Sequence, residues 1–435
     1  MSSRGGNVLI ALVGNAFAPL ASIATAPILA HALGVTGRGE VAAATAPLLL
    51  ATALATFGVP AAVTYTVARF PGAARRVARR GALVLTGTGA VVAAAIVVLR
   101  GFFAGGDPTI GALVVLAAAA LVPTLLVALL QAVAAGAHRW RLVTAERGTT
   151  AGVRLGALGA LAALGGLDVR SAVVVLAVAP LFGALAYLPL RSGAAPQDTE
   201  ADRARTRTLV SYGSRVWVGS IAGILLTRLD QALLTPLSGA VELGLYVVAV
   251  NVADIPLVVS NAVRDVSFSA DAADGDDARM LRASRLSTVT TVLVSAALAA
   301  SAPWWLPLVF GAEFRAALPA CLVLLLATAV GAQGTLAGVT LSARGAPGRR
   351  SLSLAVACVV NLVLVVLLVP SLGAVGAAIG TVVGNGLSSS LNIVQVWRRH
   401  SIRPVDFYGL RRSDLAPVRA LITRKHPRAG IKHNM

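Results

Sequence analysis

The sequence predicts an all-α polytopic membrane protein with about twelve transmembrane helices in two six-helix lobes, and three observations lead to this fold class. Hydrophobic residues make up 57% of the 435 residues and charged residues 13%, about half of the roughly 25% charge of soluble proteins. Apolar runs of bilayer-spanning length, ~20 residues, recur along the chain. Arginine and lysine fall almost entirely on one side of the resulting topology.

The apolar runs predict the membrane spans in order. The first run is too long for the hydrophobic core of a signal peptide and lacks a convincing cleavage site, so it is expected to be the first helix. The predicted spans cover residues 8–30, 41–67, 82–99, 109–135, 149–167, 171–190, 209–235, 243–263, 286–306, 316–342, 351–370 and 373–396.

The basic residues predict the orientation. With both termini in the cytoplasm, the even-numbered connections are cytoplasmic too, and these segments hold most of the 37 lysines and arginines, including the cluster at 69–80. The external connections hold only Arg38, Arg100, Arg170 and Arg315. One missed helix would invert every later connection, so the bias supports the count. It also accounts for the net charge of +19 without a nucleic-acid partner.

The polar, mixed-charge connection at 191–208 predicts the boundary between the lobes. The N-terminal lobe with this linker covers 1–208, the C-terminal lobe covers 209–397, and 398–435 form a basic cytoplasmic tail. The tail is expected to lie on the anionic inner leaflet or to be disordered.

Two sequence matches suggest that the lobes are repeats. GEVAAA at 39–44 aligns with GLYVVA at 244–249, and Gly136 aligns with Gly345 at nearly the same offset. Six is an even number, so both lobes enter the membrane in the same orientation. This predicts a parallel repeat with a central cavity between the lobes.

Five segments carry a family resemblance that extends over residues 8–396. The chain resembles the polysaccharide and lipid-linked oligosaccharide flippases, O-antigen flippases among them, of the MOP exporter superfamily, which also contains the MATE exporters and the lipid II flippases. The resembling segments are LGVTGRGEVAAAT (33–45), FGVPAAV (57–63), RLDQALLTPLSGAVELGLYVVA (228–249), LPLVFGAEFRAA (306–317) and VPSLGAVGAAIGTVVGN (369–385).

The resemblance implies a MATE-like fold and a function in the bacterial cytoplasmic membrane. The expected function is secondary transport rather than enzymatic catalysis: flipping a polyprenyl-diphosphate-linked oligosaccharide for cell-surface polysaccharide biosynthesis, such as that of lipopolysaccharide. The expected partners are the bilayer, the lipid-linked glycan and other glycan-assembly membrane proteins. No cofactor is expected beyond an H⁺ or Na⁺ gradient.

Asp254 is the sharpest single candidate because it lies near the middle of the predicted span 243–263. A charge at that depth is costly, so it should face a cavity, hold a proton or find a partner. Asn251 lies three residues earlier on the same helical face and is a substrate-binding candidate. The alternative for Asp254 is structural, a protonated side chain bonded to a neighbouring helix.

Asp230 is a second ion-coupling candidate, in the span 209–235. Some relatives combine an acidic residue here with polar residues on helices eleven and twelve in a sodium site, and the resemblance carries this role to Asn361, Thr381 and Asn385. Val365 stands where a second carboxylate would help such a site. The alternative is an interfacial aspartate near the outer end of its helix.

Arg154, Arg215 and Arg228 lie within predicted spans and are candidates for holding a diphosphate. A guanidinium stays charged and binds two phosphate oxygens at once. Arg154 and Arg215 lie near cytoplasmic ends, so snorkelling to the interface is the alternative for both.

Other function classes find little support in the sequence. No P-loop, HExxH or cysteine–histidine zinc pattern occurs, so no metal site is expected. A MATE-like drug or metabolite exporter remains an alternative because it would share the fold. A membrane glycosyltransferase or polymerase is an alternative of another class, but it would be expected to carry catalytic acidic residues in a large external loop, and the predicted external connections are short.

Overall fold

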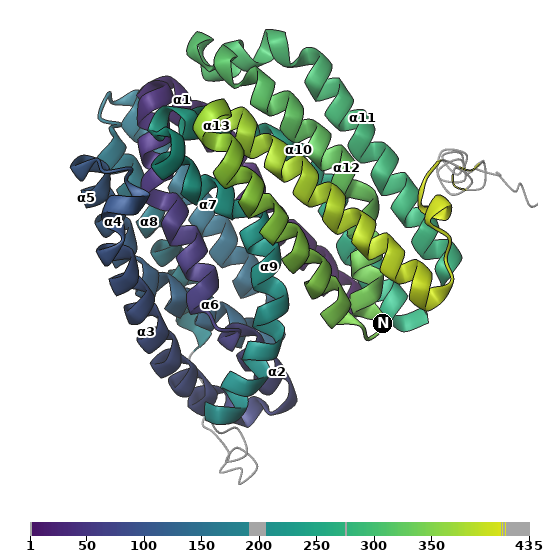
Figure 1. Cartoon of the computed structure of the whole chain (residues 1–435). Helices are drawn as coiled ribbons and strands as arrows, with labels where there is room; N and C mark the ends of the chain where they lie inside the picture. The colour runs from purple at the N-terminus through teal and green to yellow at the C-terminus, as the bar shows by residue number, and fades with distance from the viewer. Residues whose placement is uncertain (1, 191–205, 275, 410, 412–413, 415–435) are drawn as a thin grey trace, which may run out of the picture.

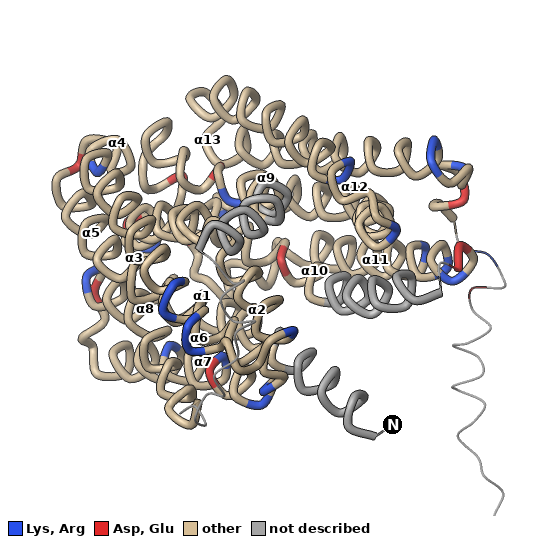
Figure 2. The backbone as a smooth tube through the Cα atoms, turned by 90° about the horizontal axis from the view of Figure 1, so that it is seen from below, with Lys and Arg blue, Asp and Glu red and all other residues tan. Residues whose placement is uncertain are grey.

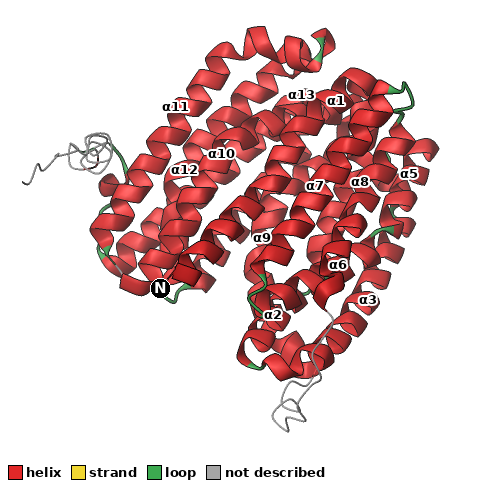
Figure 3. Cartoon of the chain, turned by 180° about the vertical axis from the view of Figure 1, so that it is seen from behind, coloured by secondary structure: helices red, strands yellow, loops and turns green. Residues whose placement is uncertain are grey.

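The computed structural model describes residues 2–190, 206–274, 276–409, 411 and 414. Nearly all of them are helical, and no strand occurs among them (Figure 1; Figure 3). The helices are α1 (Ser2–Ala55), α2 (Val59–Arg69), α3 (Ala74–Val98), α4 (Arg100–Phe103), α5 (Pro108–Ala119), α6 (Leu121–Gly136), α7 (Trp140–Ala163), α8 (Val169–Gly183), α9 (Thr206–Ser238), α10 (Ala240–Asp274), α11 (Asp277–Phe310), α12 (Leu318–Ala343) and α13 (Pro347–His400). Short 3₁₀ helices cover η1 (Pro71–Ala73), η2 (Ala184–Leu190), η4 (Ala312–Ala317) and η5 (Pro404–Phe407).

The bundle is apolar along most of its length. Within the described part of the chain, eight helical stretches are long and apolar enough to cross a membrane. Charged residues are sparse along the helices, which are mostly uncharged in Figure 2. The predicted all-helical membrane fold is therefore confirmed. The count of twelve crossings, the cytoplasmic termini and the division into two lobes stay predictions.

α13 contains two of the predicted spans. A straight helix of its 54 residues would be ~80 Å long, more than twice the ~30 Å hydrocarbon core. The helix breaks at Gly373, whose φ of 54° is left-handed, and the Glu242 carboxylate accepts a hydrogen bond from the Ala374 N–H at 2.7 Å. The two halves then pack together through Gly376 and Gly380, where a methyl group would meet Leu368 and Asn361, and through Gly384, where it would meet Asn361 as well as Leu226 of α9. The small-residue face seen in the sequence is thus a close helix contact.

α1 breaks at a different place from the one that the sequence predicts. The glycines at 37 and 39 predict a turn between spans 8–30 and 41–67, but both lie inside the helix, and the break is at Gly34 with φ 64°. Arg38 is therefore not in an external connection. It lies on the second half of α1, and only 7% of it is exposed.

The predicted span 41–67 is also interrupted. α1 ends at Ala55 and α2 begins at Val59, with Phe57 (φ 44°) and Gly58 (φ 69°) between them. Trp217 of α9 lies against this turn. Its ring stacks on Phe57 with centroids 4.8 Å apart, and its Nε1–H donates to the Ala53 carbonyl at 3.1 Å.

Part of the C-terminal tail docks on the helices. Phe407 is fully buried with Ile402 in an apolar cluster that includes Met280 of α11. Arg285 of α11 donates from both Nε and Nη2 to the buried Asp414 carboxylate, each at 2.7 Å. Residues 410, 412–413 and 415–435 of the tail lie outside the described residues.

Candidate functional site

Two adjoining cavities lie between α1, α7, α9 and α10. The larger has a volume of about 680 Å³ and the smaller about 430 Å³, within the usual range for ligand pockets. The larger is lined mainly by helices of the N-terminal half, and the smaller extends to α12 and α13. The polar residues that line both are Ser22, Arg154, Thr227, Arg228, Asn251 and Asp254.

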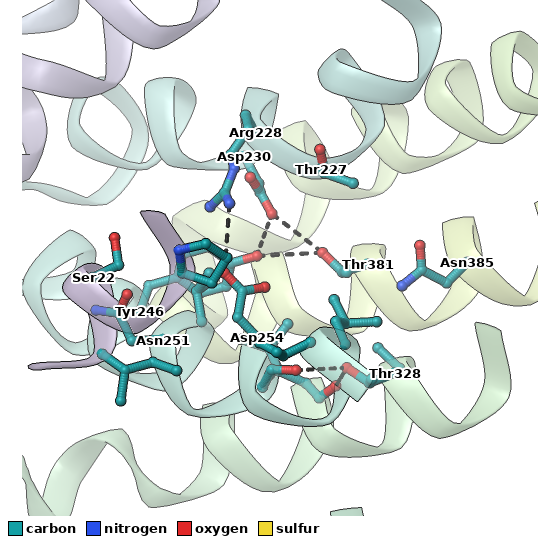
Figure 4. Close-up of a pocket in the computed structure, with 18 of the residues that line it drawn as sticks. Ser22, Thr227, Arg228, Asp230, Tyr246, Asn251, Asp254, Thr328, Thr381 and Asn385 are labelled. Carbon is teal, nitrogen blue, oxygen red and sulfur yellow. Dashed lines mark hydrogen bonds and ion pairs between the residues drawn. The ribbon is translucent and has the colours of Figure 1, made fainter. Parts of the chain in front are cut away.

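Arg228 and Asp254 form an ion pair where the cavities meet. Arg228 Nη2 lies 3.5 Å from Asp254 Oδ2, between α9 and α10 (Figure 4). The side chains are 37% and 36% exposed, respectively, so both reach cavity space rather than lipid-facing packing. Asp254, which the sequence places near the middle of a predicted span, thus has a cationic partner. The ion pair is long, and both side chains are exposed enough to exchange partners.

Asp230 lies at the centre of a hydrogen-bond network in the smaller cavity. Its carboxylate accepts from the Tyr246 hydroxyl, from Thr381 Oγ1 at 3.2 Å and from the Gln231 backbone N–H at 2.8 Å (Figure 4). Only 2% of Asp230 is exposed. Asn385 lines the same cavity, so oxygen atoms from three helices gather there.

The larger cavity holds two more arginines. Arg38 of α1 and Arg154 of α7 line it together with Arg228. Neither Nε has a hydrogen-bond partner among the described residues, and Arg154 Nη1 reaches only Ser22 Oγ at 3.4 Å. Buried like charges without a carboxylate are costly, which marks this end of the cavity as a place for an anion.

The predicted site residues have different outcomes. Arg154, Arg228, Asn251 and Asp254 meet at the cavities. The side chain of Arg215 lies outside the described residues.

Asn361 lines neither cavity. Its Nδ2 donates to the Leu226 carbonyl at 3.3 Å, and within the described part of the chain it makes no hydrogen bond to the Asp230 carboxylate. No group of three metal-ligating side chains occurs in the described ranges.

Sequence reasoning missed three residues of the site. The glycines beside Arg38 predict a connection at this position, and the apolar neighbours of Tyr246 in the span 243–263 give no sign of a polar role. Gln231 follows Asp230 directly, yet it lines the larger cavity while Asp230 lines the smaller. Arg38 and Thr45 lie seven residues apart, and this spacing was the signal that both occupy one helical face.

The fold and the cavities define a class: a multi-pass helical membrane protein built around a charged internal cavity. A family model described as polysaccharide biosynthesis protein matches residues 5–268, more than half of the chain. The chain belongs to this family. The predicted location in the bacterial cytoplasmic membrane is confirmed.

Solved structures of MOP-superfamily transporters share the fold. The lipid II flippase MurJ in an inward closed conformation is 11% identical with a TM-score of 0.71, covering 98% of this chain and 94% of its own. An inward-facing multidrug resistance MATE transporter is 14% identical with a TM-score of 0.65, covering 90% and 98%. A MOP superfamily transporter from Pyrococcus furiosus is 14% identical with a TM-score of 0.59, covering 92% and 95%. A search of curated proteins found no match.

Proposed function

We propose that this protein is a secondary transporter that flips a polyprenyl-diphosphate-linked oligosaccharide from the inner to the outer leaflet of the bacterial cytoplasmic membrane. The observation that carries the proposal is the arginine-lined larger cavity. Membership in a polysaccharide biosynthesis family and the fold of the lipid II flippase MurJ support it.

A diphosphate satisfies what the larger cavity leaves unsatisfied. Among the described residues, neither Arg38 nor Arg154 has a hydrogen-bond partner at Nε, and Arg228 pairs with Asp254 at 3.5 Å. Guanidinium groups bind phosphate oxygens in pairs, and such charge-assisted hydrogen bonds are about twice as strong as neutral ones. The diphosphate sits among these arginines while the polyprenyl chain stays in the bilayer.

Transport then requires the cavity to open alternately to the two sides of the membrane. The backbones of α1 and α10 touch at Gly39 and Gly244, at the end that the predicted topology places outside. The cavity therefore receives its substrate from the cytoplasmic side, and separation of the two halves at this contact releases it outside. Rocking of two repeats about a central site is a common form of alternating access.

The two aspartates are the proposed coupling groups. In one scheme, Asp254 releases Arg228 and takes up a proton. In the other, Asp230 takes up H⁺ or Na⁺ in the smaller cavity together with Tyr246, Thr381 and Asn385. Intramembrane carboxylates that face water commonly serve proton or ion transfer. No cofactor takes part in this scheme.

A MATE-like exporter of organic cations is the second candidate, and the two aspartates of the smaller cavity favour it. The larger cavity argues for an anion instead, because its described lining includes three arginines and a single acidic residue, Asp254.

Deleting the gene in the native host and measuring lipid-linked glycans on each leaflet separates the candidates. The flippase proposal predicts accumulation on the cytoplasmic side, restored by the wild-type chain but not by the double variant Arg38→Gln, Arg154→Gln. Unchanged glycan export together with altered drug tolerance would support the exporter and overturn the proposal.

A further inference from the structure

The second half of α1 presents one polar stripe to the larger cavity. Arg38, Thr45 and Thr52 follow one another at intervals of seven residues, and Thr56 follows just past the helix end. Seven residues are nearly two full turns, so the three side chains lie on one face over ~21 Å. All four residues line the larger cavity.

The threonines offer this cavity hydrogen-bond acceptors. Thr45 Oγ1 donates to the Val41 carbonyl and Thr52 Oγ1 to the Leu48 carbonyl, each at 2.8 Å. A hydroxyl has one proton and two lone pairs. Because each proton is used within the helix, the lone pairs are what remains for a ligand.

Two amides that line the same cavity, Gln231 of α9 and Asn251 of α10, offer donors. Gln231 is 6% exposed, and its Nε2 has no hydrogen-bond partner among the described residues. Asn251 Nδ2 is buried and likewise lacks one. Leaving a buried donor unsatisfied costs about 1–3 kcal/mol. Both amides line the larger cavity, so a ligand with acceptor groups relieves that cost.

We infer that the polar stripe of α1 and these two amides form one wall of the cavity that is the subsite for the sugar attached to the diphosphate. The Thr45 and Thr52 hydroxyls accept hydrogen bonds from sugar hydroxyls, and the Gln231 and Asn251 amides donate hydrogen bonds to them. The inference rests on the proposed function. It adds a residue set and a substrate feature, recognition of the first sugar, that the arginines do not supply.

The chemistry of the wall fits a sugar better than the other parts of the substrate. A diphosphate is ionised at neutral pH, so it has only acceptor oxygens and forms no hydrogen bond with threonine lone pairs. A polyprenyl chain has no polar group. A sugar hydroxyl both donates and accepts, which matches a wall that offers both. None of the described residues lining the larger cavity is aromatic, so recognition here depends on hydrogen bonds rather than ring stacking.

Binding to the purified full chain in nanodiscs tests the inference with two kinds of probe. One is farnesyl diphosphate, and the other is farnesyl diphosphate carrying glucose, galactose or N-acetylglucosamine on its terminal phosphate. The variants are Thr45→Val, Thr52→Val and Gln231→Leu. Thr66→Val is the matched control, because Thr66 Oγ1 makes the same bond within its helix, to the Ala62 carbonyl at 2.8 Å, and does not line the cavity.

The wild-type chain should bind at least one sugar-bearing probe more tightly than farnesyl diphosphate. Each of the three variants should weaken that probe about fivefold, the value of one hydrogen bond, and leave farnesyl diphosphate unchanged. Arg38→Gln should weaken both probes. The inference is overturned if no sugar-bearing probe has an advantage, or if the three variants weaken both probes equally. Failure of the wild type to bind either probe would instead overturn the proposed function, and the inference with it.

Discussion

Gly39 of α1 and Gly244 of α10 lie against each other through their backbones, and the contact is reciprocal. A methyl group added to either glycine would lie 3.1 Å from the backbone nitrogen of the other. Gly39 also abuts the Ala240 carbonyl, and Gly244 abuts the Val35 carbonyl. Gly39 and Gly244 are 205 residues apart, as are Val35 and Ala240, and this is the offset that the sequence match gives. Such reciprocity is what a two-fold axis produces, and it supports two repeats that meet here.

Gly39→Ala should impair closure of the external end of the cavity, where Gly39 and Gly244 meet. Its Cβ would overlap the Ala240 carbonyl, a backbone atom that cannot rotate away, so the helices must separate. We expect transport to fall at least about tenfold with normal membrane expression, and a cysteine placed near this end should become more reactive from outside. Gly156→Ala on α7, where a Cβ meets nothing within 4 Å, is the control. Normal transport by Gly39→Ala would show that the contact is not a gate.

Trp217 is expected to narrow the opposite, cytoplasmic entrance of the cavity, so that substrate enters when this contact opens. The Trp217 ring joins α9 to the turn after α1 by stacking on Phe57 and by the hydrogen bond to Ala53. Trp217→Ala should raise the labelling rate of a cysteine at Thr56 from the cytoplasmic side. Trp217→Phe keeps an aromatic ring and should have a smaller effect. Equal labelling in wild type and Trp217→Ala would argue against a cytoplasmic clasp.

Asp254→Asn should reduce transport without loss of membrane expression. The variant removes both the charge partner of Arg228 at 3.5 Å and a group that can take up a proton. We expect a decrease of about tenfold or more in flux driven by an ion gradient. Asp168→Asn is a suitable control, because Asp168 caps α8 by accepting from the Ser171 N–H and asparagine caps equally well. Full activity of Asp254→Asn would remove Asp254 from the coupling scheme.

Docking of the tail segment 401–409 on α11 should weaken at low pH. Hydrogen bonds from Arg285 lower the pKa of Asp414 to about 2, below the ordinary aspartate value of about 3.9. A lowered pKa in the folded state stabilises docking above pH ~3.9, and the stabilisation is lost as the pH falls toward 2. The hydrogen-exchange protection factors of residues 401–409, which correct for the intrinsic pH dependence of amide exchange, should therefore be high at pH 6 and lower near pH 2.5.

Asp414→Asn gives the matching comparison. It should speed exchange of the same segment at pH 6, because it leaves Arg285 buried without its carboxylate. Exchange that is independent of both acid and this substitution would show that the ion pair does not hold the tail.

The sequence was informative about the membrane fold because apolar length and basic-residue bias are set by the bilayer rather than by particular contacts. It was less informative about the positions at which helices break. Glycine marks both turns and close helix contacts, so Gly37 and Gly39 predicted a turn where the helix continues, and the break fell at Gly34. Arg38 was misplaced for this reason.

The candidate site was predicted in part. Asp254 and Arg154 stood out because charges are rare in apolar runs, and both line the cavities. The contacts within the site could not be predicted from the sequence, because the Arg228–Asp254 and Tyr246–Asp230 contacts join α9 to α10. Which faces of two helices meet is decided by tertiary packing, and no local pattern records it.

Flipping in proteoliposomes tests the central claim most directly. The purified chain is reconstituted with a polyprenyl-diphosphate-linked oligosaccharide in one leaflet, an ion gradient is applied, and glycan on the opposite leaflet is measured with an enzyme that cannot cross the membrane. The account predicts transfer by the wild-type chain and its loss, by tenfold or more, in the double variant Arg38→Gln, Arg154→Gln. Transfer that is absent in the wild type, or undiminished in that variant, would contradict it.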